Sequence, residues 1–125
     1  MLPQQSRMRS PEEFKRVLRS GRRAGGTSLS AHLLLPAAGP VPEDASPKVG
    51  FVVSRAVGSA VVRNRVKRRL RELMRGRLAS LPRGCLLVLR AHPAAASARQ
   101  ADLAADLDLV IGRLLRRQVG ALRQE

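Results

Sequence analysis

Basic side chains recur at helical spacing within residues 57–77, VGSAVVRNRVKRRLRELMRGR, of this 125-residue sequence. At 100° per residue, one side of a helix would carry Arg63, Lys67, Arg71 and Arg75, with Asn64 and Arg68 beside them. Like charges four residues apart weaken a helix by about 0.2–0.5 kcal/mol per pair. The row therefore costs stability unless a polyanion such as a phosphate backbone neutralises it.

The charge balance separates this segment from an ordinary solvated helix face. Eight of the fifteen residues from 63 to 77 are basic and only Glu72 is acidic, while the whole chain has 24 Lys and Arg against 9 Asp and Glu, a net charge of +15. No acidic strip elsewhere compensates them. Arg55, directly after a predicted strand, is placed to reach a phosphate as well. The pattern predicts a nucleic-acid partner.

The sequence offers no reactive set of its own. One cysteine, Cys85, excludes a disulfide framework, and two histidines, His32 and His92, cannot complete a four-ligand Cys/His zinc site. The few carboxylates fall mostly in loops or in the last helix, so we predict no catalytic residue and no protein-bound metal. The polar N-terminus and the short apolar runs predict a soluble, cytoplasmic protein with no membrane partner.

The elements that position these residues follow from capping and periodicity. A first helix is predicted to begin at Ser10 and to end at Gly21. Ser10 would be its N-cap, and Glu13 would complete a capping box. Residues 28–35 alternate apolar side chains with Ser30 and His32, which indicates a half-buried strand. Residues 48–54 form a second strand, in which Gly50 can admit a close backbone neighbour.

The remaining segments complete one domain. Residues 57–77 are predicted helical, capped at Ser59; residues 85–91 form a strand that is apolar on both faces, with Cys85 in the core; and a packing helix begins near Ser97. Residues 36–47 hold four prolines and form a loop. The order predicts a single α+β domain over residues 1–125, a small sheet covered by helices, with flexible ends at 1–6 and 118–125.

These residues carry a family resemblance. The run KVGFVVSRAVGSAVVRNRVKRRLRE, residues 48–72, resembles the signature of the protein subunit of bacterial ribonuclease P, with Arg63, Asn64 and Arg65 as its RNR core. The resemblance covers most of residues 7–117. It implies a fold like the second domain of ribosomal protein S five, with a mixed sheet of about four strands, the fourth coming from residues 22–27 or from a break in the first. It also implies an uncommon left-handed β-α-β crossover through the RNR helix.

The resemblance further implies a ribonucleoprotein endonuclease in which an RNA subunit, holding Mg²⁺, removes the 5′ leader from precursor tRNA and the protein assists. RNA contacts carry over to Arg63, Asn64, Arg65, Lys67, Arg68 and Arg71, to which the basic pattern adds Arg55 and Arg75. A leader-binding cleft carries over to Phe14, Leu18 and His32. Leu18 and His32 stand where the family often has aromatic residues, and a chain with two Phe and no Tyr or Trp stacks bases less, so leader contacts are expected to be more electrostatic.

Other interpretations remain open on the residues alone. A ribosomal protein or general RNA chaperone would share the charge and the fold. A DNA-binding regulator is disfavoured because no helix-turn-helix pair is present. For single residues, Phe14 can instead belong to the core, and His32 can be an exposed strand residue without a ligand.

Overall fold

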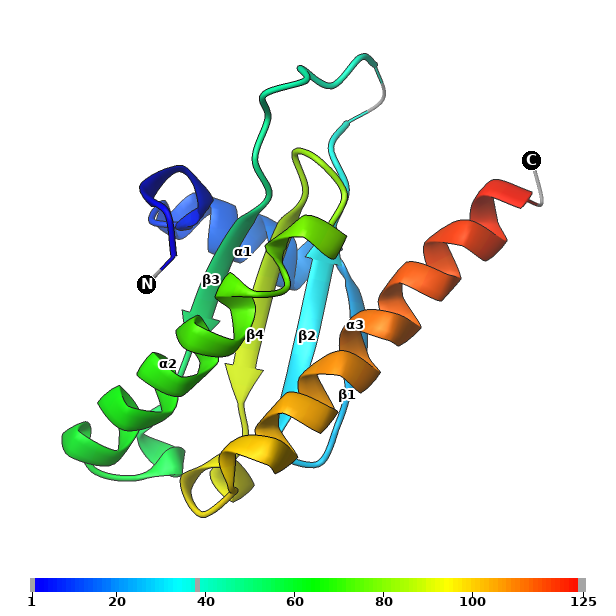
Figure 1. Cartoon of the computed structure of the whole chain (residues 1–125). Helices are drawn as coiled ribbons and strands as arrows, with labels where there is room; N and C mark the ends of the chain where they lie inside the picture. The colour runs from blue at the N-terminus through cyan, green and yellow to red at the C-terminus, as the bar shows by residue number, and fades with distance from the viewer. Residues whose placement is uncertain (1, 38, 124–125) are drawn as a thin grey trace.

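A computed structural model describes residues 2–37 and 39–123, with residues 117–123 described by their backbone. The predicted α+β class and its order of elements are confirmed (Figure 1). The elements are α1 (Pro11–Ser20), β1 (Arg22–Gly25), β2 (Leu29–Leu34), β3 (Lys48–Val52), α2 (Ala60–Arg75), β4 (Leu86–Ala91) and α3 (Gln100–Arg123), with 3-10 turns η1 (Gln4–Ser6), η2 (Arg55–Val57), η3 (Leu78–Ser80) and η4 (Pro93–Ala96).

The strands form one sheet in the order β1-β2-β4-β3. β1 supplies the fourth strand that the family resemblance implied, and it comes from residues 22–27 and not from a break in the first predicted strand. The β1–β2 and β2–β4 pairs are antiparallel, and β3 is parallel to β4. In Figure 1, β3 and β4 both run downward with α2 in front of them, and the chain passes from left to right. That path is a left-handed crossover, against the strong right-handed rule.

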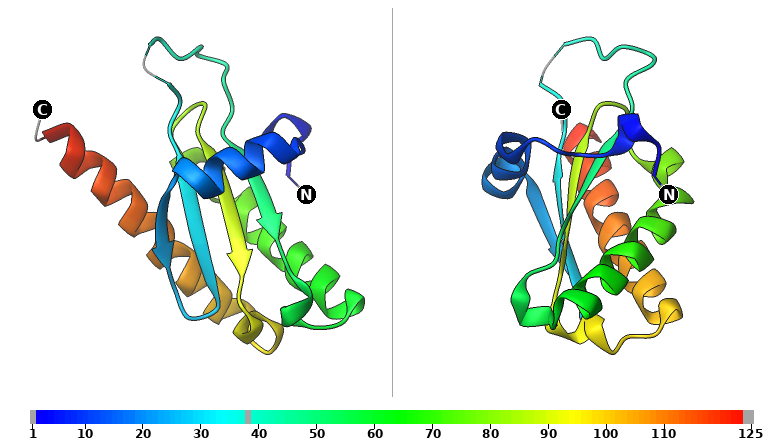
Figure 2. Two further views of the ribbon diagram at one scale, coloured as in Figure 1. Left: turned by 180° about the vertical axis from the view of Figure 1, so that it is seen from behind. Right: turned by 90° about the vertical axis from the view of Figure 1, so that its left-hand side faces the viewer.

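The helices lie on both faces of the sheet. α1 lies on one face, and α2 and α3 lie on the other (Figure 2). The main core is between the sheet and α2 and α3, where Leu87 and Leu89 of β4 meet Leu70 of α2 and Leu107 of α3. A smaller cluster under α1 contains Val17 and Val88. Burial of these apolar surfaces is the main term that holds the layers together.

The strand β2 is more buried than its alternating pattern predicts. The sequence indicates a half-buried strand, but five of its six residues are buried. Leu29, Ala31 and Leu33 face the main core, while α1 packs over part of the opposite face. The alternation of apolar and polar residues indicates which side chains share a face of the strand. It does not indicate whether a helix from elsewhere in the chain covers the second face.

The ends of two predicted helices differ from expectation. Ser10 makes no side-chain cap hydrogen bond, and Glu13 pairs with Lys48 at 3.4 Å instead of completing a capping box. The helix α2 begins at Ala60 because residues 55–57 form the turn η2 and Gly58 has a φ of 153°. The predicted cap at Ser59 is confirmed, since its side chain accepts from the Val62 amide.

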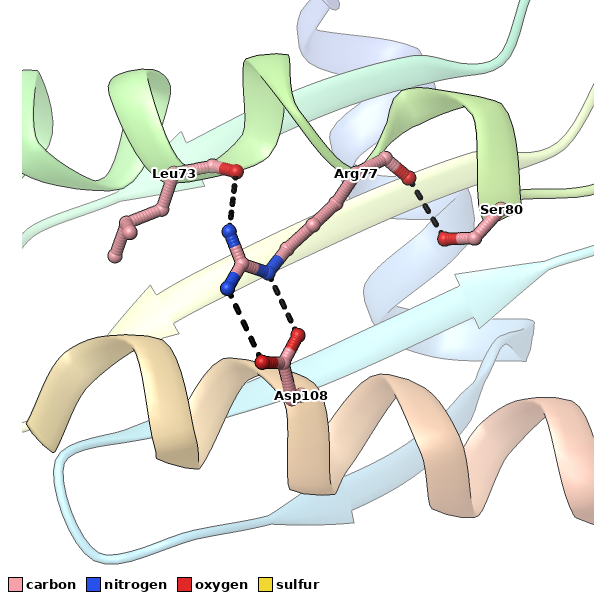
Figure 3. A network of polar contacts seen from close by, with 4 residues as sticks. All are labelled: Leu73, Arg77, Ser80 and Asp108. Atoms are coloured by element: carbon pink, nitrogen blue, oxygen red, sulfur yellow. Dashed lines mark hydrogen bonds and ion pairs between the residues drawn. The ribbon is translucent and has the colours of Figure 1, made fainter. Parts of the chain in front are cut away.

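Arg77, which follows α2, joins α2 to α3 by hydrogen bonds. Its Nε donates to Asp108 Oδ1 at 2.6 Å and its Nη2 to Oδ2 at 3.1 Å, while Nη1 donates to the Leu73 carbonyl oxygen (Figure 3). The hydrogen bond to Asp108 raises the pKa of Arg77, and the same bond lowers the pKa of Asp108. Arg77 therefore serves the fold, although the sequence places it in the basic segment.

The β1–β2 turn is tied to α3 through Asp106. The amide and the hydroxyl of Ser28 both donate to Asp106 Oδ2. The hydroxyl hydrogen bond is the largest cause of a lowered Asp106 pKa, with the Ser28 and Thr27 amides and His92 acting in the same direction and burial against it. This carboxylate fixes the start of β2 against the second turn of α3.

The lowered pKa predicts acid sensitivity. Because the folded protein holds the Asp106 carboxylate more readily than the unfolded chain does, its contribution is present at neutral pH and is lost as the pH falls through the folded pKa, below about pH 4. Urea unfolding between pH 7 and pH 2.5 should show a shallower acid loss for Asp106→Asn than for the wild type. Asp102→Asn, at an exposed ion pair with Arg99, is the control. Equal slopes for the wild type and Asp106→Asn would contradict this assignment.

The N-terminal residues 2–6 pack against the rest of the domain. Leu2 is 2% exposed and belongs to the main core, and residues 4–6 form η1. α3 continues to Arg123, so within the predicted flexible C-terminal end only residues 124–125 lie outside the described part. No helix of the described residues is long and apolar enough to cross a membrane.

Candidate nucleic-acid interface

The helix α2 presents a row of cations to solvent. Arg68, Arg71 and Arg75 are exposed, as is Asn64, and Lys67 is half-buried. None of these side chains makes a hydrogen bond or an ion pair within residues 2–37 and 39–123. Val66, Leu70 and Met74 on the opposite side of the helix are buried against the sheet. The buried side therefore fixes which way the cationic row faces.

Two predicted RNA ligands, Arg63 and Arg65, are half-buried, and one of them is hydrogen-bonded to the protein itself. Arg65 Nη2 donates to the Ala96 carbonyl oxygen at 3.2 Å, and the neighbouring Arg69 donates to the Ala98 carbonyl oxygen at 3.4 Å. Both bonds join α2 to η4 and the segment after it. The Nε atoms of Arg63 and Arg65 are buried and have no partner among the described residues. These two arginines thus differ from Arg68 and Arg71, whose guanidinium groups are open to solvent.

Two arginines outside the predicted site extend the row of cations. The segment before α1 runs along the edge of β3, where Arg7 bridges to Val49 and the Met8 amide donates to the Val49 carbonyl oxygen at 3.0 Å. Arg7 and Arg9 there share a pocket of about 350 Å³ with Lys67 and Arg71 of α2. We name this pocket the edge pocket; among the side chains that the structure describes, no carboxylate lines it.

The sequence contained a signal for the edge pocket. Residues 7–23 hold seven basic and two acidic side chains, a second basic block. Charge density alone does not show that Arg7 and Arg9 meet α2, because that juxtaposition depends on the pairing of their segment with β3. Arg55, which was predicted, is exposed in η2 immediately before α2.

The edge pocket continues to the face that carries α1. Both phenylalanines of the chain, Phe14 and Phe51, line it. Phe14 is half-buried and its ring lies over Gly50, since a Cβ built on that glycine would be 2.4 Å from Phe14 Cζ. The close neighbour expected at Gly50 is therefore an aromatic ring and not a backbone segment.

The contact between Phe14 and Gly50 predicts a coupled pair. Gly50→Ala should lower the free energy of unfolding by about 1–3 kcal/mol through overpacking, and Phe14→Leu should make the alanine more tolerable. A double-mutant cycle by urea denaturation measures the coupling. Additive effects of the two substitutions would show that the ring moves aside at no cost.

The other two predicted cleft residues differ in exposure. Leu18 of α1 is 38% exposed. His32 of β2 is 8% exposed, so its interpretation as an exposed strand residue is wrong. Burial lowers the pKa of His32, and the nearby Arg23 and Arg90 lower it further. The imidazole is therefore neutral at neutral pH, surrounded by cations.

The described residues show no reactive centre. Cys85 lies in the core as predicted, and burial raises its pKa to about 12, so its thiol stays protonated. No group of three or more His, Cys, Asp or Glu side chains in the described ranges is arranged to hold a metal ion. The arrangement presents cations and apolar surface, the surface chemistry that nucleic-acid-binding proteins use.

Known proteins match this chain over most of its length. The family model for ribonuclease P matches residues 2–115. The ribonuclease P protein component of Streptomyces avermitilis is 53% identical over 118 residues, covering 92% of this chain and 96% of the relative. That of Thermobifida fusca is 52% identical over 118 residues, covering 93% of this chain and 80% of the relative.

Solved structures show the same fold. The RNase P protein of Staphylococcus aureus superposes with a TM-score of 0.70 at 19% identity, covering 86% of this chain and 93% of that chain. The RNase P protein of Thermotoga maritima gives 0.67 at 20% identity, covering 88% and 96%. With the sequence matches, this fold assigns the chain to the bacterial ribonuclease P protein family, whose members are the protein component that works with an RNA subunit in tRNA processing.

Proposed function

We propose that this protein binds the ribonuclease P RNA through α2 and assists that RNA in removing the 5′ leader from precursor tRNA. The observation that carries the proposal is the cationic row of α2, whose exposed members have no protein partner among the described residues. A phosphate backbone would neutralise their repulsion and release counterions. Arg55, Arg63, Asn64, Arg65, Lys67, Arg68, Arg71 and Arg75 form the proposed RNA-binding set.

The leader strand would lie on the face that carries α1. Phe14 and Leu18 offer apolar contact there, and His32 lies further along the same face. The edge pocket connects this face with α2, and its cations, Arg7 and Arg9 among them, give a strand a charged path between the two. Because few aromatic side chains are present, electrostatic contacts would exceed stacking in this strand's binding energy.

The chemistry would belong to the RNA. Mg²⁺ held by the RNA subunit would activate the attacking water and stabilise the leaving oxygen, as metal ions do in phosphodiester hydrolysis. The residues described here would bind and position RNA in the bacterial cytoplasm, and none of them would exchange a proton with the reacting groups.

The test is leader cleavage of a precursor tRNA by the ribonuclease P RNA at low Mg²⁺, with and without the protein. We expect strong stimulation, because neutralised phosphates let the two RNAs approach at a lower Mg²⁺ concentration. If the protein binds the RNA without stimulating cleavage, this proposal is overturned and a general RNA-chaperone role takes its place.

A further inference from the structure

The solvent-facing side of α2 is not cationic along its whole length. Residues 56–62 carry no charged side chain, and the first exposed side chain after them is that of Asn64. Val61 is 76% exposed, more than the two other exposed large apolar side chains in the described part of the chain. We name Val61 and Asn64 the uncharged pair. Neither side chain can neutralise a phosphate, so the charge argument for the arginines of α2 does not explain them.

Helix geometry places the uncharged pair next to the phosphate-binding cations. Val61, Asn64 and Arg68 follow one another at spacings of three and four residues, so they lie on one side of α2. That side is opposite Val66 and Leu70, which are buried. Asn64 and Arg68 are about 6 Å apart along the helix axis. The sugar next to a phosphate held by Arg68 would therefore lie close to Asn64.

Both members of the uncharged pair lower the stability of the isolated helix relative to alanine. Valine and asparagine are poorer helix formers than alanine, and an exposed valine gains little from packing. The Asn64 amide makes no hydrogen bond within residues 2–37 and 39–123. A partner surface would favour these two side chains if it offered apolar contact to Val61 and a hydrogen-bonding group to Asn64.

The ribose of RNA offers both kinds of contact. Its 2′-hydroxyl donates and accepts hydrogen bonds, and DNA lacks this group. A side-chain amide also donates and accepts, whereas a guanidinium only donates. The sugar carbons beside the hydroxyl give a small apolar surface of a size that the methyl groups of a valine can cover. In an A-form helix the 2′-hydroxyls line the wide, shallow minor groove, where short side chains can reach them.

We propose that Asn64 exchanges hydrogen bonds with a ribose 2′-hydroxyl and that Val61 covers the adjacent sugar, so that this end of α2 selects RNA over DNA. Arg68 and the cations after it hold phosphates, which RNA and DNA share. The inference rests on the proposed function, in which α2 lies against the ribonuclease P RNA. It adds Val61 to the RNA contacts and gives Asn64 a role distinct from that of the neighbouring arginines.

Salt dependence separates the ribose contacts from the phosphate contacts. Asn64→Ala and Val61→Ala both favour the helix, so a loss of binding would not come from unfolding of α2. In the full-length protein each should weaken binding of the ribonuclease P RNA by about three- to tenfold. The slope of log K against log salt should stay unchanged, because no phosphate contact is lost.

Two control variants bracket this result. Arg68→Ala should lower the salt slope by about 0.7–0.9, since it removes a phosphate contact. Leu109→Ala, at the exposed leucine of α3, removes apolar surface elsewhere and should change neither the affinity nor the slope. An unchanged affinity in Asn64→Ala overturns the proposal, and so does a lower slope in that variant.

The 2′-hydroxyls are tested directly by interference mapping. The ribonuclease P RNA is transcribed with a small random fraction of 2′-deoxynucleotides, and the protein-bound and free molecules are separated and mapped. We expect certain deoxy positions to weaken binding of the wild type. Asn64→Ala should remove the effect at one or more of these positions, whereas Arg68→Ala should retain all of them. Identical maps for the wild type and Asn64→Ala overturn the assignment of a 2′-hydroxyl to Asn64.

A double-mutant cycle tests the part assigned to Val61. Excluding water strengthens a neighbouring hydrogen bond, so Val61→Ala should also weaken the contact that Asn64 makes. The loss of affinity in the double variant should therefore be smaller than the product of the two single losses. A loss equal to that product would show two independent contacts and overturn the role of Val61 as the cover of this hydrogen bond.

The cleavage assay keeps two failures distinct. If the protein stimulates leader cleavage but Asn64→Ala binds and maps like the wild type, this inference fails and the proposed function stands. If the deoxy positions depend on Asn64 but cleavage is not stimulated, α2 recognises ribose in RNA and the proposed function fails.

Discussion

Replacing Lys67, Arg68 and Arg71 together by alanine is expected to weaken binding of the ribonuclease P RNA by roughly two orders of magnitude at 0.15 M salt. Each phosphate contact contributes about 0.7–0.9 to the slope of log K against log salt, and three such contacts at that salt give this factor. The slope itself should fall by about two to three units. Filter binding across a salt series measures both quantities.

The free energy of unfolding of this triple variant should stay nearly the same or increase. None of the three side chains makes a hydrogen bond or an ion pair in the described part of the chain. Alanine is the best helix former, and removing like charges four residues apart relieves repulsion. Arg22→Ala, on the edge strand furthest from β3 in the sheet order, removes a positive charge elsewhere and should leave the slope unchanged. A loss of affinity at constant slope would show that the three side chains are not phosphate ligands.

The sequence predicted this cationic row well because a helix is a local structure. With Ser59 as the N-cap of α2, the spacing of Val66 and Leu70 determines which side of this helix is buried. Arg68 and Arg71 then lie on its exposed side. The same local reasoning located β2, β3 and β4 to within a few residues, whereas β1 was expected only from the family resemblance. It extended β3 to residue 54, whereas the strand ends at Val52 and the chain then turns into η2.

What the sequence could not predict depends on contacts between distant segments. Arg65 and Arg77 belong to the same basic block as Arg68, yet one bonds to η4 and the other to Asp108 of α3. Their distinction from Arg68 requires knowing where α3 begins and how it crosses α2. Likewise, Arg23 and Arg90 are far apart in the chain and meet around His32 only through the sheet order.

The left-handed crossover is a further limit of local reasoning. Periodicity gives strand, helix and strand for residues 48–91, and general rules of connection then favour the right-handed path. The family resemblance supplied the correct hand. The isolated pairing of Arg7 with Val49, which adds the N-terminal segment to the outer edge of β3, has no periodic signal at all.

Leu70→Ala is expected to lower the free energy of unfolding of the isolated protein by about 2–5 kcal/mol. Leu70 is fully buried between α2 and the sheet, and truncating such a side chain loses its transfer free energy and leaves a cavity. Thermal unfolding should shift downward by roughly 4 °C per kcal/mol for a domain of this size. Leu109→Ala, at a 42% exposed leucine of α3, is the matched control and should change stability little.

RNA binding should restore much of the free energy of unfolding that the Leu70→Ala variant loses. A ligand that binds only the folded state adds about 2.7 kcal/mol of stability at one hundred times its Kd, which is comparable to the expected deficit. The variant should therefore stimulate leader cleavage nearly normally at saturating RNA, with an unchanged salt slope, because its cationic row is intact whenever it is folded. The triple variant should behave in the opposite way, stable but weak in binding. If Leu70→Ala also lowered the salt slope, the buried side of α2 would be setting the RNA contacts directly, and the division of this helix into a packing side and a binding side would be wrong.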